Sequence, residues 1–311
     1  MLYGLVVVMT ADTILILGTG ALATLFAARL SAAGVDVTML GSWPEGLAAL
    51  NQRGAELDGR AYPVRATADP VECRGAGSAL VLVKAWQTER AAAQLADCLA
   101  ADGLAVTLQN GLGNAAVLAR TLGLTRVAVG VTTLGANLAG PGCVVSGGEG
   151  PVTLEAHPRL AGLESMLGAA GFAVDVVADV RLLVWGKLAV NAAINPLTAL
   201  LRVRNGQLLE LPSARRLMGA LAGEAAAVAE SRGVALPAPG PGRLAEEVAR
   251  RTAQNLSSML QDVLRGTSTE VDAINGAIVR EGEQHGVPAP INRALWSLVK
   301  AAVHQPQVDE N

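Results

Sequence analysis

Residues 13–23 read TILILGTGALA, and this stretch decides the fold. The apolar, β-branched run at 13–17 predicts a buried strand, and the helical pattern that follows it runs to Ala33 and ends at Gly34. A G-x-G-x-x-A pattern joins the two elements. Its first glycine permits a tight turn, its second lets a ligand approach the backbone, and its alanine keeps the helix close to the strand. The stretch therefore predicts a dinucleotide site made of Gly18, Thr19, Gly20, Ala21, Leu22 and Ala23.

The rest of the first half alternates short apolar runs with helical stretches. Fully apolar strands that alternate with helices are typical of a parallel sheet covered on both faces. The Gly-rich segment 135–155 predicts hairpin strands, and a last helix–strand unit is expected at about 159–178. We therefore predict a Rossmann-type, doubly wound domain over residues 11–179, with further strands at 35–40, 79–83, 104–108 and 127–131 and helices around 88–101 and 114–122.

From about Val180 onward the strand signals stop and the pattern becomes helical. The fold class is thus α/β, with an all-α C-terminal domain over residues 180–311 behind the Rossmann-type domain. Ala-rich helices pack equally well within a chain or between two chains, so a homodimer is left open. Helices are expected at 181–201, 206–232, 241–265, 269–285 and 291–303.

Composition narrows the class of protein. A formal net charge of −3 over 311 residues offers no basic surface for nucleic acid or for a membrane. The mean hydropathy is +0.39, yet no apolar run of about 18 residues exists, so we expect no transmembrane helix. The three cysteines, Cys73, Cys98 and Cys143, fit neither a disulfide framework nor a zinc site. We expect a cytoplasmic protein without a metal.

The chain opens with the apolar segment MLYGLVVV, which has no basic residues before it and makes a poor signal peptide. A second methionine, Met9, begins a segment that already contains the complete first strand. We therefore interpret residues 1–10 as an N-terminal extension, with a targeting segment as the alternative.

The end of the second predicted strand bears on the choice of cofactor. NAD enzymes usually carry Asp or Glu there to hold the ribose hydroxyls, whereas this chain has Gly41-Ser42-Trp43. Without that carboxylate the 2′-phosphate of NADP meets no repulsion, and Ser42 is expected to donate a hydrogen bond to it. Trp43 either covers the adenine or is a packed loop aromatic, and Glu45 lies near enough to weaken the distinction. We predict NADP.

Two polar segments follow strands that are expected to end at the cofactor. They are VKAWQT at 83–88 and QNGLGN at 109–114. Open α/β sheets bind their ligands at the carboxyl ends of the strands. Lys84 and Asn110 are therefore placed to meet a nicotinamide ribose and an anionic substrate.

A third polar group lies on the predicted helix 181–201. Lys187, Asn191 and Asn195 stand at i, i+4 and i+8, so they form one stripe on a helix that is otherwise apolar. Such side chains are costly there unless they face a wet cleft or satisfy one another. An exposed lysine flanked by hydrogen-bonded asparagines is the structural alternative.

A fourth group lies in the helical segments that follow. Asn255, Ser258 and Asp262 are expected to share one helix face. Thr269 with Asp272 predicts a helix N-cap with a capping-box acid, which puts Glu270 in the first turn. A carboxylate is stabilised at that place by the helix dipole, and this structural role is compatible with a role in binding.

Taken together, these segments resemble the ketopantoate reductase (2-dehydropantoate 2-reductase) family over nearly the whole chain after residue 12, and in the family's order. The stretches that carry the resemblance are GTGALA, VKAWQT, QNGLGN, KLAVNAAINPLTAL and NLSSMLQDVLRGTSTEVDAINGAIV. The resemblance implies an NADPH-dependent oxidoreductase that reduces ketopantoate to pantoate in pantothenate and coenzyme A biosynthesis. It also implies a cleft between a Rossmann domain and a helical domain.

The resemblance further implies a role for each polar residue. Lys187 would be the catalytic acid, and Glu270 would bind the substrate and help to place the lysine. The chemistry of the residues agrees, because hydride transfer to a ketone leaves an alkoxide that needs a proton, and no motif contains a histidine. Asn191, Asn195 and Ser258 would bind the ketoacid with Asn255 nearby, and Lys84, Asn110 and Glu270 would also contact the cofactor.

One departure and two alternatives stand beside this interpretation. The family commonly has an arginine after the second strand to clamp the 2′-phosphate, and this chain has Ser42-Trp43 instead. A hydroxy acid dehydrogenase with another substrate, such as a 3-hydroxy acid, has a similar N-terminal half, although the spacing from Lys187 to Glu270 speaks against it. A non-enzymatic NADP(H)-binding sensor would not need Lys187 and Glu270.

Overall fold

The computed structural model of the protein describes residues 13–303, so the predicted N-terminal extension lies outside the described residues. Contacts divide the described chain into two compact units. The first comprises residues 13–109 and 114–180, and the second comprises residues 110–113 and 181–303. The division at Val180 and Arg181 lies next to the expected boundary, but the short segment 110–113 belongs to the helical unit rather than to the sheet.

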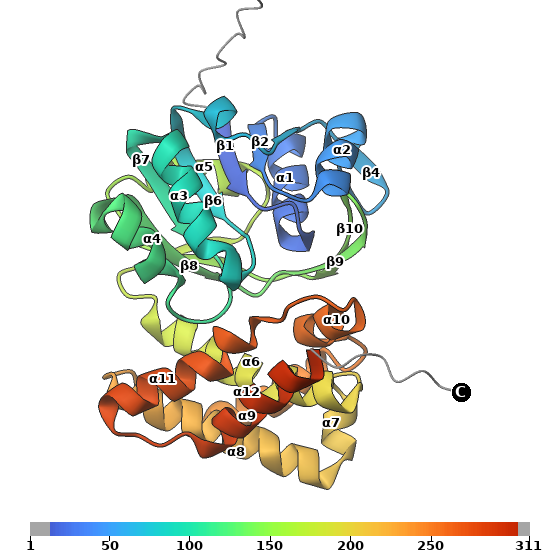
Figure 1. Cartoon of the computed structure of the whole chain (residues 1–311), viewed down its shortest axis with the longest axis vertical. Helices are drawn as coiled ribbons and strands as arrows, with labels where there is room; N and C mark the ends of the chain where they lie inside the picture. Colours follow the sequence, from blue (N-terminus) through green and yellow to red (C-terminus); the bar gives the residue numbers. More distant parts are fainter. Residues whose placement is uncertain (1–12, 304–311) are drawn as a thin grey trace, which may run out of the picture. The chain divides into compact units, whose positions relative to one another are not determined.

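An eight-stranded sheet forms the core of the first unit (Figure 1). Its strand order is β12-β11-β8-β7-β6-β1-β2-β5, and every neighbouring pair is parallel except β11 with β8. The predicted doubly wound sheet is therefore confirmed. The strands are β1 (Thr13–Leu17), β2 (Asp36–Leu40), β5 (Arg65–Thr67), β6 (Ala76–Val81), β7 (Leu99–Thr107), β8 (Val127–Thr132), β11 (Val152–Glu155) and β12 (Val174–Val177).

Strand β1 explains why the central strands are apolar throughout. Its side chains point alternately to the two faces of the sheet, and helices cover both faces. Ile14 and Ile16 belong to the core on one face, and Leu15 and Leu17 belong to the core on the other. The first core includes α1 (Ala21–Ala32) and α5 (Ala161–Ala169), and the second includes α3 (Thr88–Cys98) and α4 (Asn114–Leu122).

A second sheet of four strands has the order β4-β3-β10-β9. β9 and β10 form the hairpin that the sequence predicts, and they pair antiparallel. β11, the last part of the predicted hairpin segment, joins the large sheet instead. The strands of the small sheet are β3 (Ala55–Leu57), β4 (Arg60–Tyr62), β9 (Gly135–Gly140) and β10 (Cys143–Gly148).

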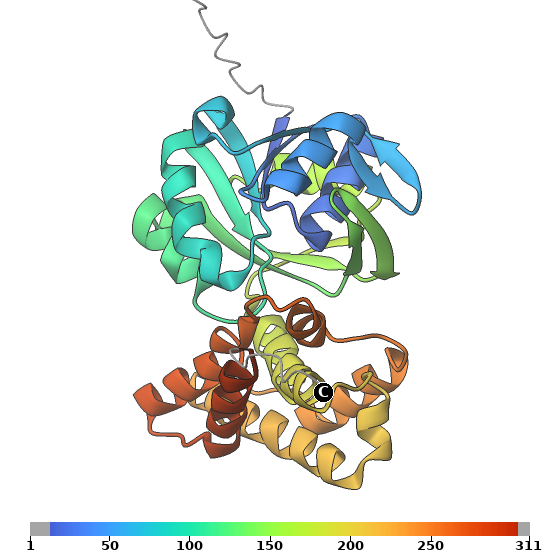
Figure 2. The same cartoon turned by 45° about the vertical axis from the view of Figure 1, so that its right-hand side comes forward.

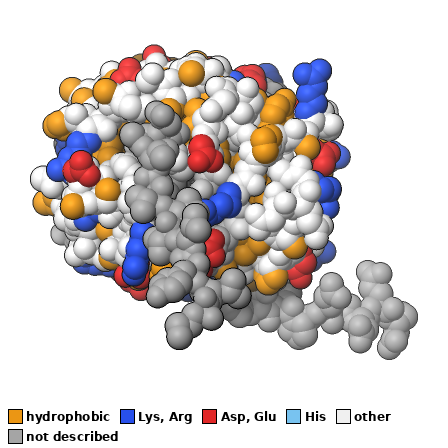
Figure 3. All heavy atoms as spheres, turned by 90° about the horizontal axis from the view of Figure 1, so that it is seen from above, with side chains coloured by type: hydrophobic (Ala, Val, Ile, Leu, Met, Phe, Trp, Pro, Cys, Tyr) orange, Lys and Arg blue, Asp and Glu red, His pale blue; other side chains and the backbone are white. Residues whose placement is uncertain are grey.

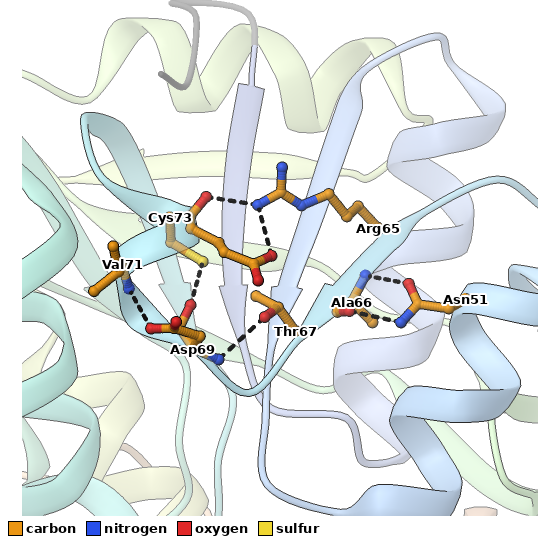
Figure 4. Close-up of polar contacts among 8 residues, drawn as sticks. Asn51, Arg65, Ala66, Thr67, Asp69, Val71 and Cys73 are labelled. Atoms are coloured by element: carbon orange, nitrogen blue, oxygen red, sulfur yellow. Dashed lines mark hydrogen bonds and ion pairs between the residues drawn. The ribbon is translucent and has the colours of Figure 1, made fainter. Parts of the chain in front are cut away.

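The edge strand β5 is protected by a side chain from α2 (Pro44–Arg53), as Figure 4 shows. The Asn51 amide donates to the backbone oxygen of Ala66 at 2.7 Å and accepts from its backbone nitrogen at 2.9 Å. It thus occupies backbone groups that a free edge would offer to another strand. Beyond β5, the Asp69 carboxylate accepts from the nitrogen of Val71 at 2.9 Å and begins a short 3₁₀ turn.

The second unit consists of helices gathered around α6 (Arg181–Leu201), which packs against α8, α9, α10 and α12 (Figure 2). The predicted all-α C-terminal domain is confirmed. The bounds of α6 and those of the last helix agree with expectation to within a residue. The other helices are α7 (Gln207–Glu210), α8 (Pro212–Ser231), α9 (Pro241–Arg251), α10 (Ser258–Leu264), α11 (Asn275–His285) and α12 (Pro290–Val303).

Three predicted helices are interrupted, and a fourth is shorter than expected. The expected helix 206–232 breaks between α7 and α8 because Leu211, which precedes Pro212, is extended. The expected helix 269–285 starts as a 3₁₀ turn, η4 (Glu270–Asp272), and α11 follows it. The expected helix 88–101 ends at Cys98, because Leu99 already pairs with Ala76 of the neighbouring strand.

The expected helix 241–265 contains a gap between α9 and α10. Backbone groups in this gap bond to the turn before α7 instead of continuing a helix. The oxygen of Asn255 accepts from the nitrogen of Asn205, and the oxygen of Ala253 accepts from the nitrogen of Gly206, both at 3.1 Å. The prediction that Asn255 shares a helix face with Ser258 and Asp262 is therefore wrong.

Charges are mixed on the surface of the protein. On the face seen in Figure 3, Lys and Arg side chains lie among Asp and Glu side chains, and no continuous basic area is visible outside the grey atoms. Among the helices of residues 13–303, none is long and apolar enough to cross a membrane.

Candidate active site

The glycine-rich turn after β1 has two glycines with different reasons to be glycine. Gly18 has a φ of +123°, and a Cβ there would lie 3.1 Å from the backbone carbon and oxygen of Leu82. The positive φ and the nearby backbone both exclude a residue with a Cβ, so the fold itself requires glycine at this position. Gly20 has an ordinary φ of −85°, and a Cβ there would meet nothing within 4 Å. Glycine suits the N-cap position of Gly20, and the open space around it leaves room for a ligand to approach the backbone.

The same turn leads into the N-terminus of α1. No side chain caps this terminus, and its first turn contains no acidic residue. Unpaired N–H groups at a helix N-terminus, with the positive end of the helix dipole, attract phosphate. Ala23 is fully buried against the sheet, which is the close helix packing that the fingerprint predicts.

The end of β2 lies against this turn. A Cβ on Gly41 would lie 2.6 Å from Cγ2 of Thr19, so only glycine lets the two loops approach so closely. Ser42 follows and is exposed. Trp43 is part-buried, and its indole packs over Gly46 in the first turn of α2, where a Cβ would lie 2.4 Å from Cε3 of the ring. This supports the interpretation of Trp43 as a packed loop aromatic.

The loop after β6 carries Lys84, whose ammonium lies 5.9 Å from the ring centroid of Trp86. Trp86 is 48% exposed, which is unusual for a large aromatic. The side chain of Gln109, which was not identified from the sequence, holds this loop through hydrogen bonds. Nε2 of Gln109 donates to the oxygen of Val83 at 3.0 Å and to Oγ1 of Thr88 at 2.9 Å. Gln109 therefore connects the ends of β6 and β7.

In the helical unit, α6 carries the predicted polar stripe. Lys187 and Asn191 are part-buried and Asn195 is buried, so the alternative of an exposed lysine does not hold. Most of the helix from Trp185 to Ala199 faces the core, with Trp185, Leu188 and Ile194 among its buried residues. A lysine amine in such surroundings loses hydration.

Glu270 is 94% buried and begins the turn η4, so this carboxylate needs partners. Nδ2 of Asn110 donates to its Oε2 at 3.1 Å. Asn110 reaches it because segment 110–113 is fixed to the end of η4, where the nitrogen of Leu112 donates to the oxygen of Ala273 at 3.0 Å. A Cβ on Gly111 would lie 2.3 Å from that same oxygen, and the φ of Gly111 is +85°.

Electrostatics couple Lys187 to Glu270. Burial lowers the pKa of Lys187 from 10.5 to about 8, and the negative charge of Glu270 acts in the opposite direction. A lysine with a pKa near neutrality is a good proton donor at physiological pH, because both of its protonation states are accessible. The charge of Glu270 thus acts on a lysine that the sequence separates widely from it.

The structure places the remaining predicted residues on the segment before and at the start of α10. Ser258 is the first residue of α10 and is exposed, and Asn255 is exposed in the preceding turn. A buried hydroxyl pair connects this place to α6, since Oγ1 of Thr198 donates to Oγ of Ser257 at 2.7 Å. Ser257 in turn caps α10 by accepting from the nitrogen of Leu260.

Thr269 caps η4 as predicted, by accepting from the nitrogen of Val271. Asp272, however, is not the capping-box acid. Its Oδ1 accepts from Nε1 of Trp296 at 2.7 Å and from Nζ of Lys300 at 3.1 Å, both on α12. The carboxylate therefore connects two elements instead of closing its own turn.

Other chemistries find little support among the described residues. Burial raises the pKa of Cys73 to about 11 and that of Cys98 to about 12, so neither is a thiolate nucleophile at neutral pH. Within residues 13–303, no group of three or more His, Cys, Asp or Glu is arranged to hold a metal ion.

Comparison with known proteins now bears on this arrangement. The family described as ketopantoate reductase PanE/ApbA matches residues 14–159, and the C-terminal region of the same family matches residues 179–303. The 2-dehydropantoate 2-reductase of Archaeoglobus fulgidus is 39% identical over 303 residues, which cover 94% of this chain and 98% of that protein. The chain belongs to the ketopantoate reductase family. The enzyme of that name from Halobacterium salinarum is 36% identical over 301 residues, which cover 93% of this chain and 98% of that protein.

Solved structures of other proteins agree with the fold. A PanE/ApbA family ketopantoate reductase from Ralstonia eutropha has a TM-score of 0.88 at 32% identity, covering 94% of this chain and 98% of that one. A D-mandelate dehydrogenase with NADH and anilino(oxo)acetate has a TM-score of 0.87 at 25% identity, with the same coverage. The sequence-based assignment to the ketopantoate reductase family is thereby confirmed.

The coupling of Lys187 to Glu270 yields a direct prediction. The chain has only three lysines, Lys84, Lys187 and Lys300, so lysine labelled with ¹³C at Cε gives three NMR signals that are readily assigned. We expect Lys187 to titrate near pH 8, well below an ordinary lysine. Glu270→Gln removes the charge that favours the ammonium and should lower the Lys187 pKa further. An unchanged or higher pKa in Glu270→Gln, with Lys300 as internal reference, would contradict the coupling.

Proposed function

We propose that this protein is a cytoplasmic, NADPH-dependent 2-dehydropantoate 2-reductase, which converts ketopantoate to pantoate in pantothenate and coenzyme A biosynthesis. The observation that carries the proposal is that Lys187 is part-buried on α6, with a lowered pKa, and is acted on by the charge of the buried Glu270. Two relatives at 39% and 36% identity bear that enzyme name, which supports the choice of substrate.

The residues of the first unit fit a nicotinamide dinucleotide. The open space at Gly20 and the uncapped N-terminus of α1 suit a pyrophosphate, and Gly18, Thr19, Ala21, Leu22 and Ala23 complete that turn. Ser42 is exposed, as a donor to the 2′-phosphate must be, and Lys84 would meet the nicotinamide ribose. When bound, the reduced cofactor supplies a hydride to the carbonyl carbon of the ketoacid.

The residues of the helical unit would bind and orient the ketoacid. Asn191, Asn195 and Ser258 offer neutral donors to its carboxylate, with Asn255 close by. Glu270 would accept a hydrogen bond from a substrate hydroxyl. Asn110 already donates to Glu270, so this carboxylate is held in place before a substrate binds.

Lys187 would act as the general acid. The alkoxide that hydride transfer leaves is a strong base, and the Lys187 ammonium would stabilise its charge and then donate the proton. The amine must be charged before each turnover. Glu270 favours the charged form against the effect of burial, so the lysine remains able to donate near neutral pH.

A reductase of another 2-oxo acid that uses NADH is the second candidate. The lack of an arginine after β2 and the likeness to a D-mandelate dehydrogenase with NADH favour it. A non-enzymatic NADP(H) sensor has less support, since Lys187 and Glu270 are both in place. Oxidation of NADPH and, separately, of NADH by the purified protein, with ketopantoate against a panel of other 2-oxo acids and 3-oxo acids, distinguishes the three. Turnover of ketopantoate should exceed that of every other acid by at least about tenfold in kcat/KM, a difference of about 1.4 kcal/mol. Preference for another acid would overturn the substrate, and no turnover at all would favour the sensor.

Replacement of the proposed acid should affect chemistry and not cofactor binding. Lys187→Ala should lower kcat by about 10²- to 10⁴-fold, the usual contribution of a positioned general acid. This fall in kcat corresponds to an activation barrier that is about 3–5 kcal/mol higher. The Kd for NADPH, measured by fluorescence titration, should change by less than about threefold, because the substitution affects the chemical step and not cofactor binding. Turnover close to that of the wild type would remove Lys187 from the mechanism.

The two glycines of the phosphate turn offer a matched pair of variants. Gly20→Ala should lower the free energy of unfolding by less than about 1 kcal/mol, through the less favourable N-cap, but weaken NADPH binding at least about tenfold, because its methyl would occupy the space that the pyrophosphate needs. Gly18→Ala should destabilise the protein itself by about 1–3 kcal/mol, because its φ is positive and its Cβ would crowd the backbone of Leu82. Tight NADPH binding by Gly20→Ala would contradict the proposed site.

Ser42 should control the choice between cofactors. We expect the wild type to prefer NADPH, but by less than an enzyme with a phosphate-clamping arginine, since a neutral donor is weaker than a bidentate charged one. Ser42→Asp should shift the preference toward NADH by placing a carboxylate near the 2′ position. The ratio of kcat/KM for the two cofactors measures this, and equal or better use of NADH by the wild type would disprove the NADP assignment alone.

A further inference from the structure

Pro196 creates a vacancy in the hydrogen bonding of α6. It lies inside the helix and is buried, and a proline has no N–H to donate to the carbonyl four residues earlier. That carbonyl belongs to Ala192, which is fully buried. A buried carbonyl without a donor costs free energy, so the position needs a partner from elsewhere.

Asn275, the first residue of α11, supplies that partner. Its Nδ2 donates to the oxygen of Ala192 at 3.2 Å and to Oδ1 of Asn292 at 2.9 Å. The side chain is fully buried, and its own Oδ1 has no hydrogen-bond partner. Because both neighbours of Nδ2 are oxygens, the amide cannot turn around without placing oxygen against oxygen. Asn275 therefore acts here as a donor in one fixed orientation.

The bonds continue from Asn275 into two further helices. Nδ2 of Asn292 donates to the oxygen of Leu221 at 3.1 Å and to Oε2 of Glu224 on α8 at 2.8 Å. The carboxylate of Glu224 also accepts from the backbone nitrogens of Ile291 and Asn292, at 2.9 and 2.8 Å, and so caps the start of α12. One chain of hydrogen bonds, buried at Asn275 and Asn292 and part-buried at Glu224, thus connects α6, α11, α12 and α8.

Asn275 is close in sequence to Glu270, and the backbone between them is well fixed. The nitrogens of Ala273 and Ile274 both donate to the oxygen of Glu270 at 3.0 Å. Ala273 in turn holds the segment that carries Asn110. Anchoring Asn275 to α6 therefore anchors the turn of Glu270 to the helix that bears Lys187, whose position is five residues before Ala192.

We propose that Asn275 is a positioning residue for the active site, which holds the turn of Glu270 in register with Lys187 through the Ala192 carbonyl that Pro196 leaves open. This inference rests on the proposed function for its catalytic consequence, but the bond itself does not depend on any substrate. Asn275 touches neither substrate nor reacting atoms, so its effect on turnover is transmitted through Glu270.

A double-mutant cycle tests the bond without any assay of activity. Pro196→Ala restores an N–H that can bond the Ala192 carbonyl within α6. In the wild-type background Asn275→Ala should raise the unfolding equilibrium constant by about 5- to 150-fold, the effect of a buried group left unpaired. In the Pro196→Ala background, the increase in the unfolding equilibrium constant that Asn275→Ala causes should be at least about fivefold smaller. Such non-additivity is the signature of coupled sites. If Asn275→Ala has the same effect on urea unfolding in both backgrounds, the proposed role of the bond between Asn275 and the Ala192 carbonyl is wrong.

Activity tests the positioning role. Asn275→Ala should lower kcat for the ketoacid about 10- to 100-fold, as misplacement of a supporting group does. Val279→Ala is the matched control, because Val279 is a buried residue of the same helix that makes no contact in this chain of bonds. It should keep kcat within about twofold despite its own loss of stability. Equal losses of kcat in both variants would reduce Asn275 to a merely structural residue. Should Asn275→Ala fail to fold, Asn275→Ser serves in its place.

The NMR signal of Lys187 gives a readout that needs no substrate. Glu270 is a charged group whose field acts on Lys187. If Asn275 holds Glu270 in place, Asn275→Ala should lower the Lys187 pKa in the same direction as Glu270→Gln, and Val279→Ala should leave it unchanged. An unchanged Lys187 pKa in Asn275→Ala would overturn the positioning role. If instead the wild type proves inactive on ketoacids while the cycle and the pKa respond, the proposed function fails and the positioning role stands.

Discussion

The charge of Lys187 within an apolar helix is the constraint from which the rest of the helical unit follows. Burial opposes the ammonium form, and the carboxylate of Glu270 supports it, so that the pKa of Lys187 comes to about 8. A carboxylate that is itself buried needs hydrogen bonds, and Asn110 provides one of them. The buried carboxylate that stabilises the Lys187 ammonium thus requires a hydrogen-bond donor of its own.

Further polar connections join α6 to its neighbours. Thr198 reaches the cap of α10 through Ser257, and Asn275 reaches the carbonyl that Pro196 leaves open. Both connections attach segments with proposed binding residues to the helix that carries the proposed acid. Hydrogen bonds in a buried network are stronger than in water, and misplacement of a group within it is costly. The helical unit therefore has the means to keep its side chains in one arrangement.

The sequence was sufficient for the features that depend on local pattern. The glycine turn was predicted because Gly18 must adopt a φ that other residues avoid, and α6 was predicted because its apolar residues have helical spacing. Strands β3, β4 and β5 were not predicted, since three residues each are too few to show an alternation. The pairing of Lys187 with Glu270 was inferred from resemblance and not from spacing.

What escaped prediction depends on contacts between distant residues. The gap between α9 and α10 exists because Asn255 and Ala253 bond to residues about fifty positions earlier, which no local pattern reveals. The same holds for Asn275, whose partners Ala192 and Asn292 are 83 and 17 residues away. Trp43 was left open between two roles, and its packing over Gly46 became visible only in the folded chain.

The central claim is that the Lys187 ammonium donates the proton that completes the reduction. The pH dependence of kcat/KM for NADPH-dependent reduction of ketopantoate tests it most directly, because this ratio reports the protonation state of the free enzyme. A donor must be protonated, so the rate should be full below the Lys187 pKa and fall about tenfold per pH unit above about 8. A rate that is constant from about pH 7 to 10, or that rises through this range, would contradict the account.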